Sequence, residues 1–221
     1  MNVRQRTTLW AKPVTVEDCN ISGASIAGIG CYESDLRLLR STIYNNPQQG
    51  IIVQGGFALI QDSGFHTNGV GIMIHLSDNY VIDGNNKFSR VKIVGEAEIQ
   101  GCTIFENALP GVIIGPSGTV SIRQCTISDG KGAGILVNDQ GHATVEDSHI
   151  AGNTHAGIEM GNKAVCSAKR CQIINNGVGV HIKRKAEGIV EQCDLTGNTR
   201  GAWYIEGFDR MCRVTRSGNK E

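Results

Sequence analysis

A short pattern of apolar and polar positions repeats along most of the chain. In its clearest copy, the apolar residue Ile122 is followed three residues later by Cys125 and two residues after that by Ile127. Farther along comes a Gly and then a triplet whose outer residues, Ile135 and Val137, are apolar. Alternation of inward and outward positions over a few residues predicts short β-strands.

The pattern recurs at nine places when the copies are aligned on their Cys or Ser. These positions are Cys19, Ser41, Ser63, Cys102, Cys125, Ser148, Cys171, Cys193 and Ser217, with steps of 22, 22, 39, 23, 23, 23, 22 and 24 residues. A unit this short cannot bury its own apolar face, so it must stack on its neighbours. We therefore predict an all-β fold, a single-stranded right-handed parallel β-helix of about nine 22–23-residue coils plus one short irregular coil.

The step of 39 residues marks an interruption in this repeat. We predict that residues 14–221 form the β-helix, with an irregular insertion at about residues 75–96. Val91 and Ile93 resemble the apolar triplet of a coil, which places the short irregular coil there, and the rest of the insertion is predicted as a turn or protruding loop. Residues 1–13 lack the pattern and are expected to form an N-terminal arm or cap.

Two kinds of residue recur at inward positions. All eight cysteines fall on such positions, so we expect them to be small buried residues with poorly reactive thiols. Asparagine stands three residues after the inward apolar residue in six coils, where stacked side-chain amides can bond from coil to coil. These are Asn46, Asn68, Asn107, Asn153, Asn176 and Asn198.

Charge and composition exclude several classes of function. Lys and Arg together number 21, as do Asp and Glu, so the chain lacks the basic excess of proteins that bind nucleic acid through its backbone. No apolar run is long enough to cross a membrane. The start of the chain has no apolar core of a signal peptide, and the cysteines look reduced, so we expect an intracellular, cytoplasmic protein. No motif calls for a metal or another cofactor.

The segment from Asn107 to Met160 resembles the parallel β-helix repeats of pectin-lyase-like proteins. It is most similar to the repeats shared by carbohydrate-binding and sugar-hydrolase proteins, F-box β-helix adaptors and Shc-binding spindle proteins. The resemblance covers about residues 14–219 and implies the fold, which hosts lyases, hydrolases, epimerases, adhesins and adaptors. Catalytic motifs of polygalacturonases have only partial echoes, at Gly141-His142 and His181-Ile182-Lys183, and the adaptor relatives imply a protein-binding surface.

The middle residue of each apolar triplet is predicted to face outward. In the first half of the chain this column is apolar at four positions: Ile52, Met73, Ile113 and Leu136. An exposed apolar stripe usually marks an interface. We predict that a partner protein or another domain covers it, and the insertion at residues 75–96 is the other possible cover.

In the second half, the same column carries Glu159, His181 and Tyr204, with Lys183 two residues beyond His181. These four residues are the candidates for acid–base catalysis. The alternative is a structural polar ladder in which Lys183 pairs with Glu206. A pair of carboxylates, Glu106 and Asp129, is predicted to stack on adjacent coils at roughly the separation that a retaining glycosidase requires, but at a turn edge and not in a groove.

Two functional hypotheses follow. The first is a non-catalytic protein-interaction or scaffold module, part of a larger protein or complex. The second is a carbohydrate-active β-helix, either an enzyme of the polysaccharide lyase, hydrolase or epimerase type or a glycan-binding protein. The absent catalytic motifs and the scarcity of aromatic residues, which are 5% of the chain, favour the first.

Overall fold

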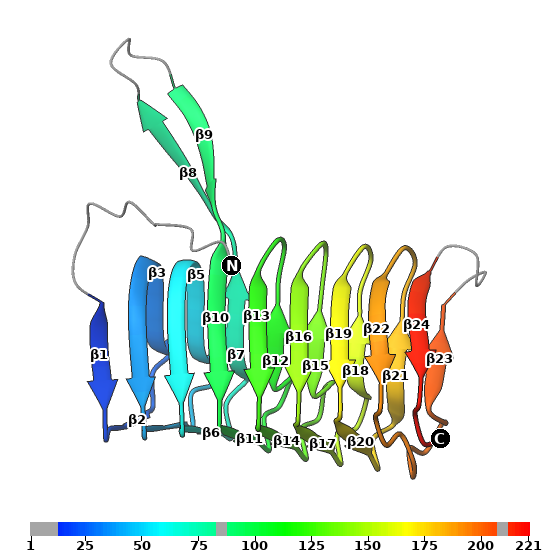
Figure 1. The fold of residues 1–221 in the computed structure, drawn as a ribbon. Coiled ribbons are helices and arrows are strands. Elements are labelled where there is room, and N and C mark those ends of the chain that lie inside the picture. Colours follow the sequence, from blue (N-terminus) through cyan, green and yellow to red (C-terminus); the bar gives the residue numbers. More distant parts are fainter. Residues whose placement is uncertain (1–12, 83–87, 207–211) are drawn as a thin grey trace.

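The chain winds into a parallel β-solenoid of about eight turns, seen from the side in Figure 1. The structure is a computed structural model, and it describes residues 13–82, 88–206 and 212–221, with the side chains of residues 79–91 also left out. None of the described residues lies in a helix, so none belongs to a helix long and apolar enough to cross a membrane. The predicted all-β parallel fold is confirmed.

Each turn contributes strands to three faces, which we call A, B and C. Face A contains β1 (Val14–Glu17), the second part of β3 (Ala27–Leu39), the second part of β5 (Gln49–Gln61), β10 (Gly95–Gln100), β13 (Thr119–Arg123), β16 (His142–Glu146), β19 (Val165–Lys169), β22 (Glu187–Glu191) and β24 (Arg213–Ser217). Face B contains β2 (Asn20–Ser22), β4 (Thr42–Tyr44), β6 (Gly64–His66), β11 (Thr103–Phe105), β14 (Thr126–Ser128), β17 (His149–Ala151) and β20 (Gln172–Ile174).

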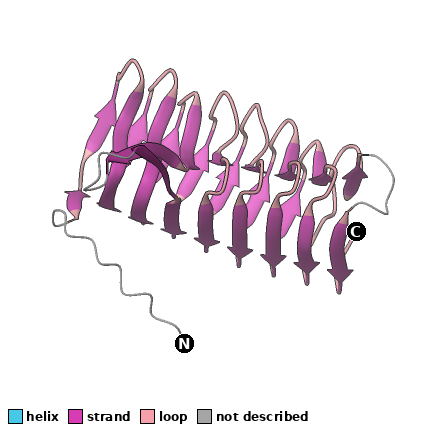
Figure 2. Cartoon of the chain, turned by 90° about the horizontal axis from the view of Figure 1, so that it is seen from above, coloured by secondary structure: helices cyan, strands magenta, loops and turns pink. Residues whose placement is uncertain are grey.

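Face C contains the first parts of β3 and β5, β7 (Val70–His75), β12 (Val112–Ile114), β15 (Ile135–Val137), β18 (Ala156–Met160), β21 (Val178–Ile182) and β23 (Trp203–Ile205). Because β3 and β5 each run through the corner between the two faces, A and C form one 15-stranded sheet, while B forms a 7-stranded sheet. Seen from above, the strands lie in rows along the axis (Figure 2).

The core is a set of inward columns of aliphatic side chains. Ile60, Ile99 and Ile122 stack in register on face A, and each is at most 1% exposed. Burial of a side chain of this size contributes roughly 1.5–3 kcal/mol, which is the main source of stability for so short a repeat. The core is therefore formed between turns, as the sequence repeat requires.

The asparagine ladder is present at the corner between faces B and C. Asn46 Nδ2 donates to Asn68 Oδ1 at 2.9 Å, and Asn153 Nδ2 donates to Asn176 Oδ1 at 3.0 Å. A glycine column packs against it: a Cβ at Gly157 would lie 2.3 Å from Ile173 Cγ2 and 2.9 Å from Asn176 Nδ2. Only glycine fits at Gly157, which explains why a Gly precedes every apolar triplet except the last, where Ala202 precedes Trp203.

The cysteines differ in part from the prediction. Cys102, Cys125, Cys166, Cys171 and Cys193 are at most 2% exposed, and Cys31 is 5% exposed. Burial raises the pKa of the Cys166 thiol to about 12, which makes it a poor nucleophile. Cys212 is only half-buried, and Cys19 in the first described turn is exposed, so the prediction that all eight point into the core is wrong for that residue. All eight are free thiols.

The 39-residue step contains a β-hairpin in place of the predicted short irregular coil. Strand β8 (Ser77–Ile82) pairs antiparallel with β9 (Phe88–Ile93), and Val91 and Ile93 belong to this hairpin. Because β5 pairs directly with β10 and β6 with β11, the step is one ordinary turn with an insertion at the corner between faces C and A. The hairpin projects from the solenoid (Figure 1).

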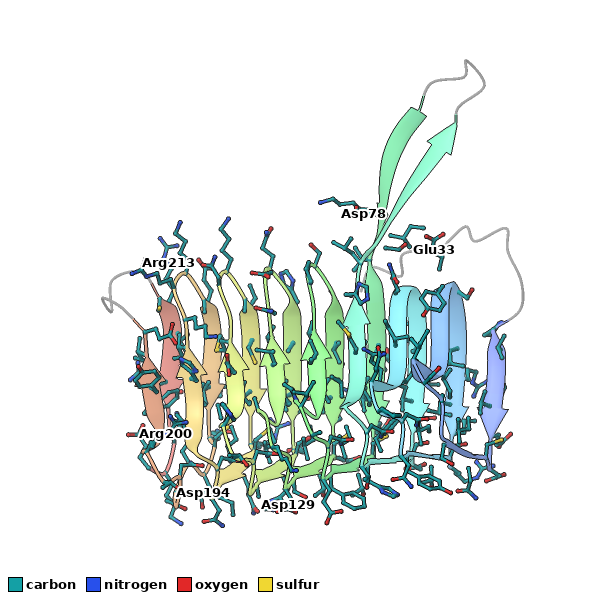
Figure 3. All side chains as sticks on the ribbon, turned by 180° about the vertical axis from the view of Figure 1, so that it is seen from behind. Glu33, Asp78, Asp129, Asp194, Arg200 and Arg213 are labelled. Carbon is teal, nitrogen blue, oxygen red and sulfur yellow. The ribbon has the colours of Figure 1, made fainter. Side chains whose placement is uncertain are left out.

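The base of the hairpin is fixed to the solenoid by local contacts. Ser77 Oγ donates to Glu33 Oε1 at 2.7 Å, and Figure 3 shows Glu33 beside Asp78 at this base. A Cβ at Gly55 would lie 3.2 Å from both Ile93 Cγ2 and Ser77 Cβ, so this glycine allows the hairpin to approach. Of the predicted arm at residues 1–13, all but Pro13 lie outside the described residues.

Candidate functional site

The outward residues of face C form one continuous column. Register runs from Ile52 to Met73, from Met73 to Ile113, and from Ile113 to Leu136. It continues from Leu136 to Glu159, from Glu159 to His181, and from His181 to Tyr204. Since adjacent parallel strands lie about 4.8 Å apart, the column spans about 29 Å along the axis. The alignment of the sequence repeat places these residues correctly on one line.

The apolar half of the column is less exposed than a free stripe would be. Ile52, Met73, Ile113 and Leu136 are each half-buried, and none is among the exposed large apolar side chains of the described chain. Stacked aliphatic side chains cover one another along the axis, so each loses part of its exposure to the turn on either side. A partner protein on this half stays a prediction.

The polar half is a network across three turns. Lys183 Nζ lies 2.7 Å from Glu159 Oε1, and His181 Nε2 lies 2.9 Å from Glu206 Oε1. The rings of His181 and Tyr204 are 4.9 Å apart between centroids and tilted by 55°. The four sequence candidates therefore do come together, but Lys183 pairs with Glu159 and not with Glu206 as predicted. The pairing is diagonal between adjacent turns, because Glu159 is in register with His181 and Lys183 lies two residues beyond His181.

The network controls the charge of Glu159. The His181 ring, when it is protonated, and the Lys183 ammonium hold the pKa of the Glu159 carboxyl at about 2, against the opposing effect of burial. Of the two, Lys183 makes the short contact, since His181 Nδ1 is 3.8 Å from Glu159 Oε2. The same carboxylate raises the pKa of Lys183. Glu159 is thus ionised at ordinary pH and is a fixed negative charge, unsuited to donate a proton.

A pocket of about 220 Å³ opens over this network. It is lined by His155, Ala156, Glu159, Val178, His181, Lys183, Arg200 and Tyr204. Tyr204 is 51% exposed and Arg200 is also exposed, so both can reach a ligand. Arg200 lies near the end of the solenoid far from the hairpin (Figure 3). The pocket therefore combines one carboxylate with four side chains that can carry positive charge.

Sequence reasoning did not assign two polar residues of the pocket, His155 and Arg200, to this site. Each stands two residues after an asparagine of the ladder, Asn153 or Asn198, in the turn that enters face C. This constant spacing was the signal that could have found them. The backbone ladder fixes the turn, because Thr154 N bonds to Gly130 O at 2.9 Å and Arg200 N bonds to Gly177 O at 2.8 Å.

Other candidate chemistry is not brought to this pocket. Glu106 and Asp129 lie in the turns after β11 and β14, and neither lines the pocket; Figure 3 shows Asp129 at the lower edge of the solenoid. Within the described chain, no group of three or more His, Cys, Asp or Glu side chains is placed to hold a metal ion.

The comparison with family models decides the family. A model described as the right-handed beta helix region matches residues 7–88 and 88–219. The chain belongs to the right-handed β-helix family. The predicted resemblance to pectin-lyase-like β-helices is thereby confirmed, and so is the handedness of the solenoid. No curated protein matches the chain at a significant level of sequence similarity.

Several solved structures that share the fold of this β-helix chain are of polysaccharide-active enzymes. The periplasmic alginate epimerase AlgG is 15% identical with a TM-score of 0.70, over 90% of this chain and 51% of that one. The A-module of the mannuronan C-5 epimerase AlgE4 from Azotobacter vinelandii is 11% identical with a TM-score of 0.66, over 92% and 58%. The catalytic domain of a GH87 α-1,3-glucanase is 13% identical with a TM-score of 0.54, over 93% and 49%.

The identities are low, so these likenesses establish the fold, and this chain spans about half the length of the solved structures it matches. They nevertheless overturn the preferred hypothesis from the sequence. The interpretation as a non-catalytic protein-interaction scaffold is corrected, because the similar structures are polysaccharide epimerases and a glucanase. The missing motifs did not exclude the second hypothesis, since side chains from different turns can meet on one face of a repeat fold. The intracellular location stays a prediction.

Proposed function

We propose that this β-helix protein binds an acidic polysaccharide in the face C pocket and transfers a proton at the sugar carbon next to the carboxylate. This is the reaction class of uronate epimerases and lyases. The proposal rests mainly on the arrangement of His181 and Tyr204, whose ring centroids are 4.9 Å apart. The same pocket is also lined by Lys183 and Arg200. This chemistry requires a general base, a general acid and cationic groups that stabilise the developing negative charge.

Each group has a role in the proposal. His181 accepts the proton, and Tyr204, which is exposed beside it, is the second proton-transfer group. Arg200 binds the sugar carboxylate, because its guanidinium has no carboxylate partner in the described structure and bonds only to Gly177 O at 3.4 Å. Lys183 and Glu159 neutralise each other and hold the floor of the pocket in place.

The ionisation of Glu159 favours proton transfer over glycoside hydrolysis. A glycosidase needs a carboxylic acid with a raised pKa to protonate the leaving group. Glu159, the one carboxylate among the residues that line this pocket, has a pKa of about 2 instead.

A panel of uronate polysaccharides and neutral glucans tests the proposal. We expect a change in sugar configuration seen by proton NMR, or an unsaturated product seen by ultraviolet absorbance, with uronates only. His181→Ala is expected to lower the rate by about 100-fold or more. His142→Ala is the matched control, because His142 is an exposed residue of β16 on face A. Hydrolysis of a glucan, or full activity of His181→Ala, would contradict the proposal.

A further inference from the structure

Glu206 is the residue in closest contact with His181, although it does not line the pocket. It follows β23 directly, and its backbone N–H bonds to Ile182 O at 2.9 Å, which continues the sheet by one residue. From there its Oε1 reaches His181 Nε2 at 2.9 Å. The His181 side chain is 16% exposed, so this bond is partly shielded from water. The backbone of Glu206 is thus held by the sheet, while its side chain is 44% exposed.

The contact determines which ring nitrogen carries the proton. A carboxylate only accepts hydrogen bonds, so the bond to Glu206 requires a hydrogen on Nε2. The other nitrogen, Nδ1, lies 3.8 Å from Glu159 Oε2, which is too long for a hydrogen bond. Glu159 is instead engaged by Lys183 at 2.7 Å. In neutral His181, Nδ1 is therefore left with a free lone pair.

We infer that Glu206 is a positioning residue, which keeps the proton of neutral His181 on Nε2 and so makes Nδ1 the atom that accepts the substrate proton. This inference rests on the proposed function for its catalytic meaning. In the step, the C–H bond next to the sugar carboxylate breaks, its proton goes to Nδ1, and the electron pair moves into that carboxylate. The imidazolium formed is then paired with Glu206, as a histidine is by its carboxylate partner in hydrolytic triads.

The tautomer can be measured without any substrate. Protein labelled with ¹⁵N-histidine reports by NMR which ring nitrogen bears hydrogen, and comparison with His181→Ala assigns the signal. We expect wild-type His181 to be one tautomer with hydrogen on Nε2, and Glu206→Ala to give a mixture of both tautomers. Hydrogen on Nδ1 in the wild type, or an unchanged tautomer in Glu206→Ala, would overturn the inference.

A kinetic test separates this inference from the proposed function. With an active uronate polysaccharide, Glu206→Ala should lower kcat by about tenfold or more and leave KM within about twofold, because the residue acts on proton transfer and not on binding. Glu187→Ala is the matched control, since Glu187 is an exposed carboxylate on face A, 4.0 Å from Arg213. If no polysaccharide is turned over, the proposed function fails while the NMR result still decides the role of Glu206. If kcat is unchanged in an active enzyme, only the positioning role fails.

Discussion

The two halves of the face C column share a backbone but differ in chemistry. From Ile52 to Leu136 the outward side chains are apolar, whereas from Glu159 to Tyr204 they are polar and in contact with one another. Beneath both halves the inward residues are alike, because Ile135 and Ile158 are both at most 1% exposed and pair in register. The inward positions therefore carry the fold, and the outward positions can change without altering it.

The largest effect on stability is expected when a side chain of this shared core is truncated. Ile135→Ala under the apolar half and Ile158→Ala under the polar half should each cost about 3 kcal/mol, since each leaves a cavity that neighbouring turns cannot fill. Urea unfolding followed by circular dichroism measures both. The two losses should agree within about 1 kcal/mol. A loss confined to one of them would mean that the two halves do not have equivalent cores.

The next effect concerns the asparagine ladder. Asn153 Oδ1 accepts from Gly130 N at 3.1 Å, and Nδ2 donates to Ile127 O at 3.2 Å. Asn153→Ala should cost about 2 kcal/mol, because buried backbone groups lose their partners. Asn68→Ala, whose Nδ2 donates to Ile43 O at 3.0 Å, is the matched variant in the other half of the chain. A change below about 0.5 kcal/mol in both, read from urea unfolding midpoints, would show that water replaces the ladder.

The difference between inward and outward positions also explains what the sequence could predict. The repeat of Ile122, Cys125 and Ile127 identified the parallel coil and its register, because a side chain pointing inward meets the same steric demand in every turn. The hairpin at β8 and β9 could not be predicted with the same rule. Its two strands pair with each other in a sheet of their own, so Val91 and Ile93 lie in strands that do not follow the repeat.

The candidate site was predictable in part for the same reason. Register placed Glu159, His181 and Tyr204 on one line, since strands fix the direction of their side chains. That Lys183 pairs with Glu159 on the preceding turn depends on the length and conformation of the lysine side chain, which the repeat does not encode. Arg200 enters from a turn, where spacing from Asn198 was the available guide.

A smaller effect is expected from Lys183→Met, which separates electrostatics from packing in the polar half. The pKa of Glu159 in the folded chain is about 2, below its ordinary value, so the ionised carboxylate stabilises the fold above the ordinary pKa. That stability is lost as pH falls toward 2. Removing Lys183 raises the pKa of Glu159, so the variant should lose about 1 kcal/mol near neutral pH and less in acid.

The measurement is urea unfolding of both proteins at several pH values from neutral to about 3. The difference in the free energy of unfolding between wild type and Lys183→Met should become smaller as the pH falls. Lys169→Met is the matched control, because Lys169 pairs with Glu191 at 2.7 Å on face A, away from the pocket. A difference that is independent of pH would assign the effect to lost packing of the lysine stem.

The smallest effect is expected from Leu136→Gln, at the boundary between the two halves. Leu136 faces outward and is half-buried between Ile113 and Glu159, so an amide there remains in contact with water. Its free energy of unfolding should change by about 0.5 kcal/mol or less in urea, in contrast to Ile135→Ala one residue earlier. A loss above about 2 kcal/mol would instead make the apolar half a second, outer part of the core. In that case the polar half would lack a stabilising outer layer that the apolar half has, and its polar side chains would not be simply a different set of tolerated surface residues.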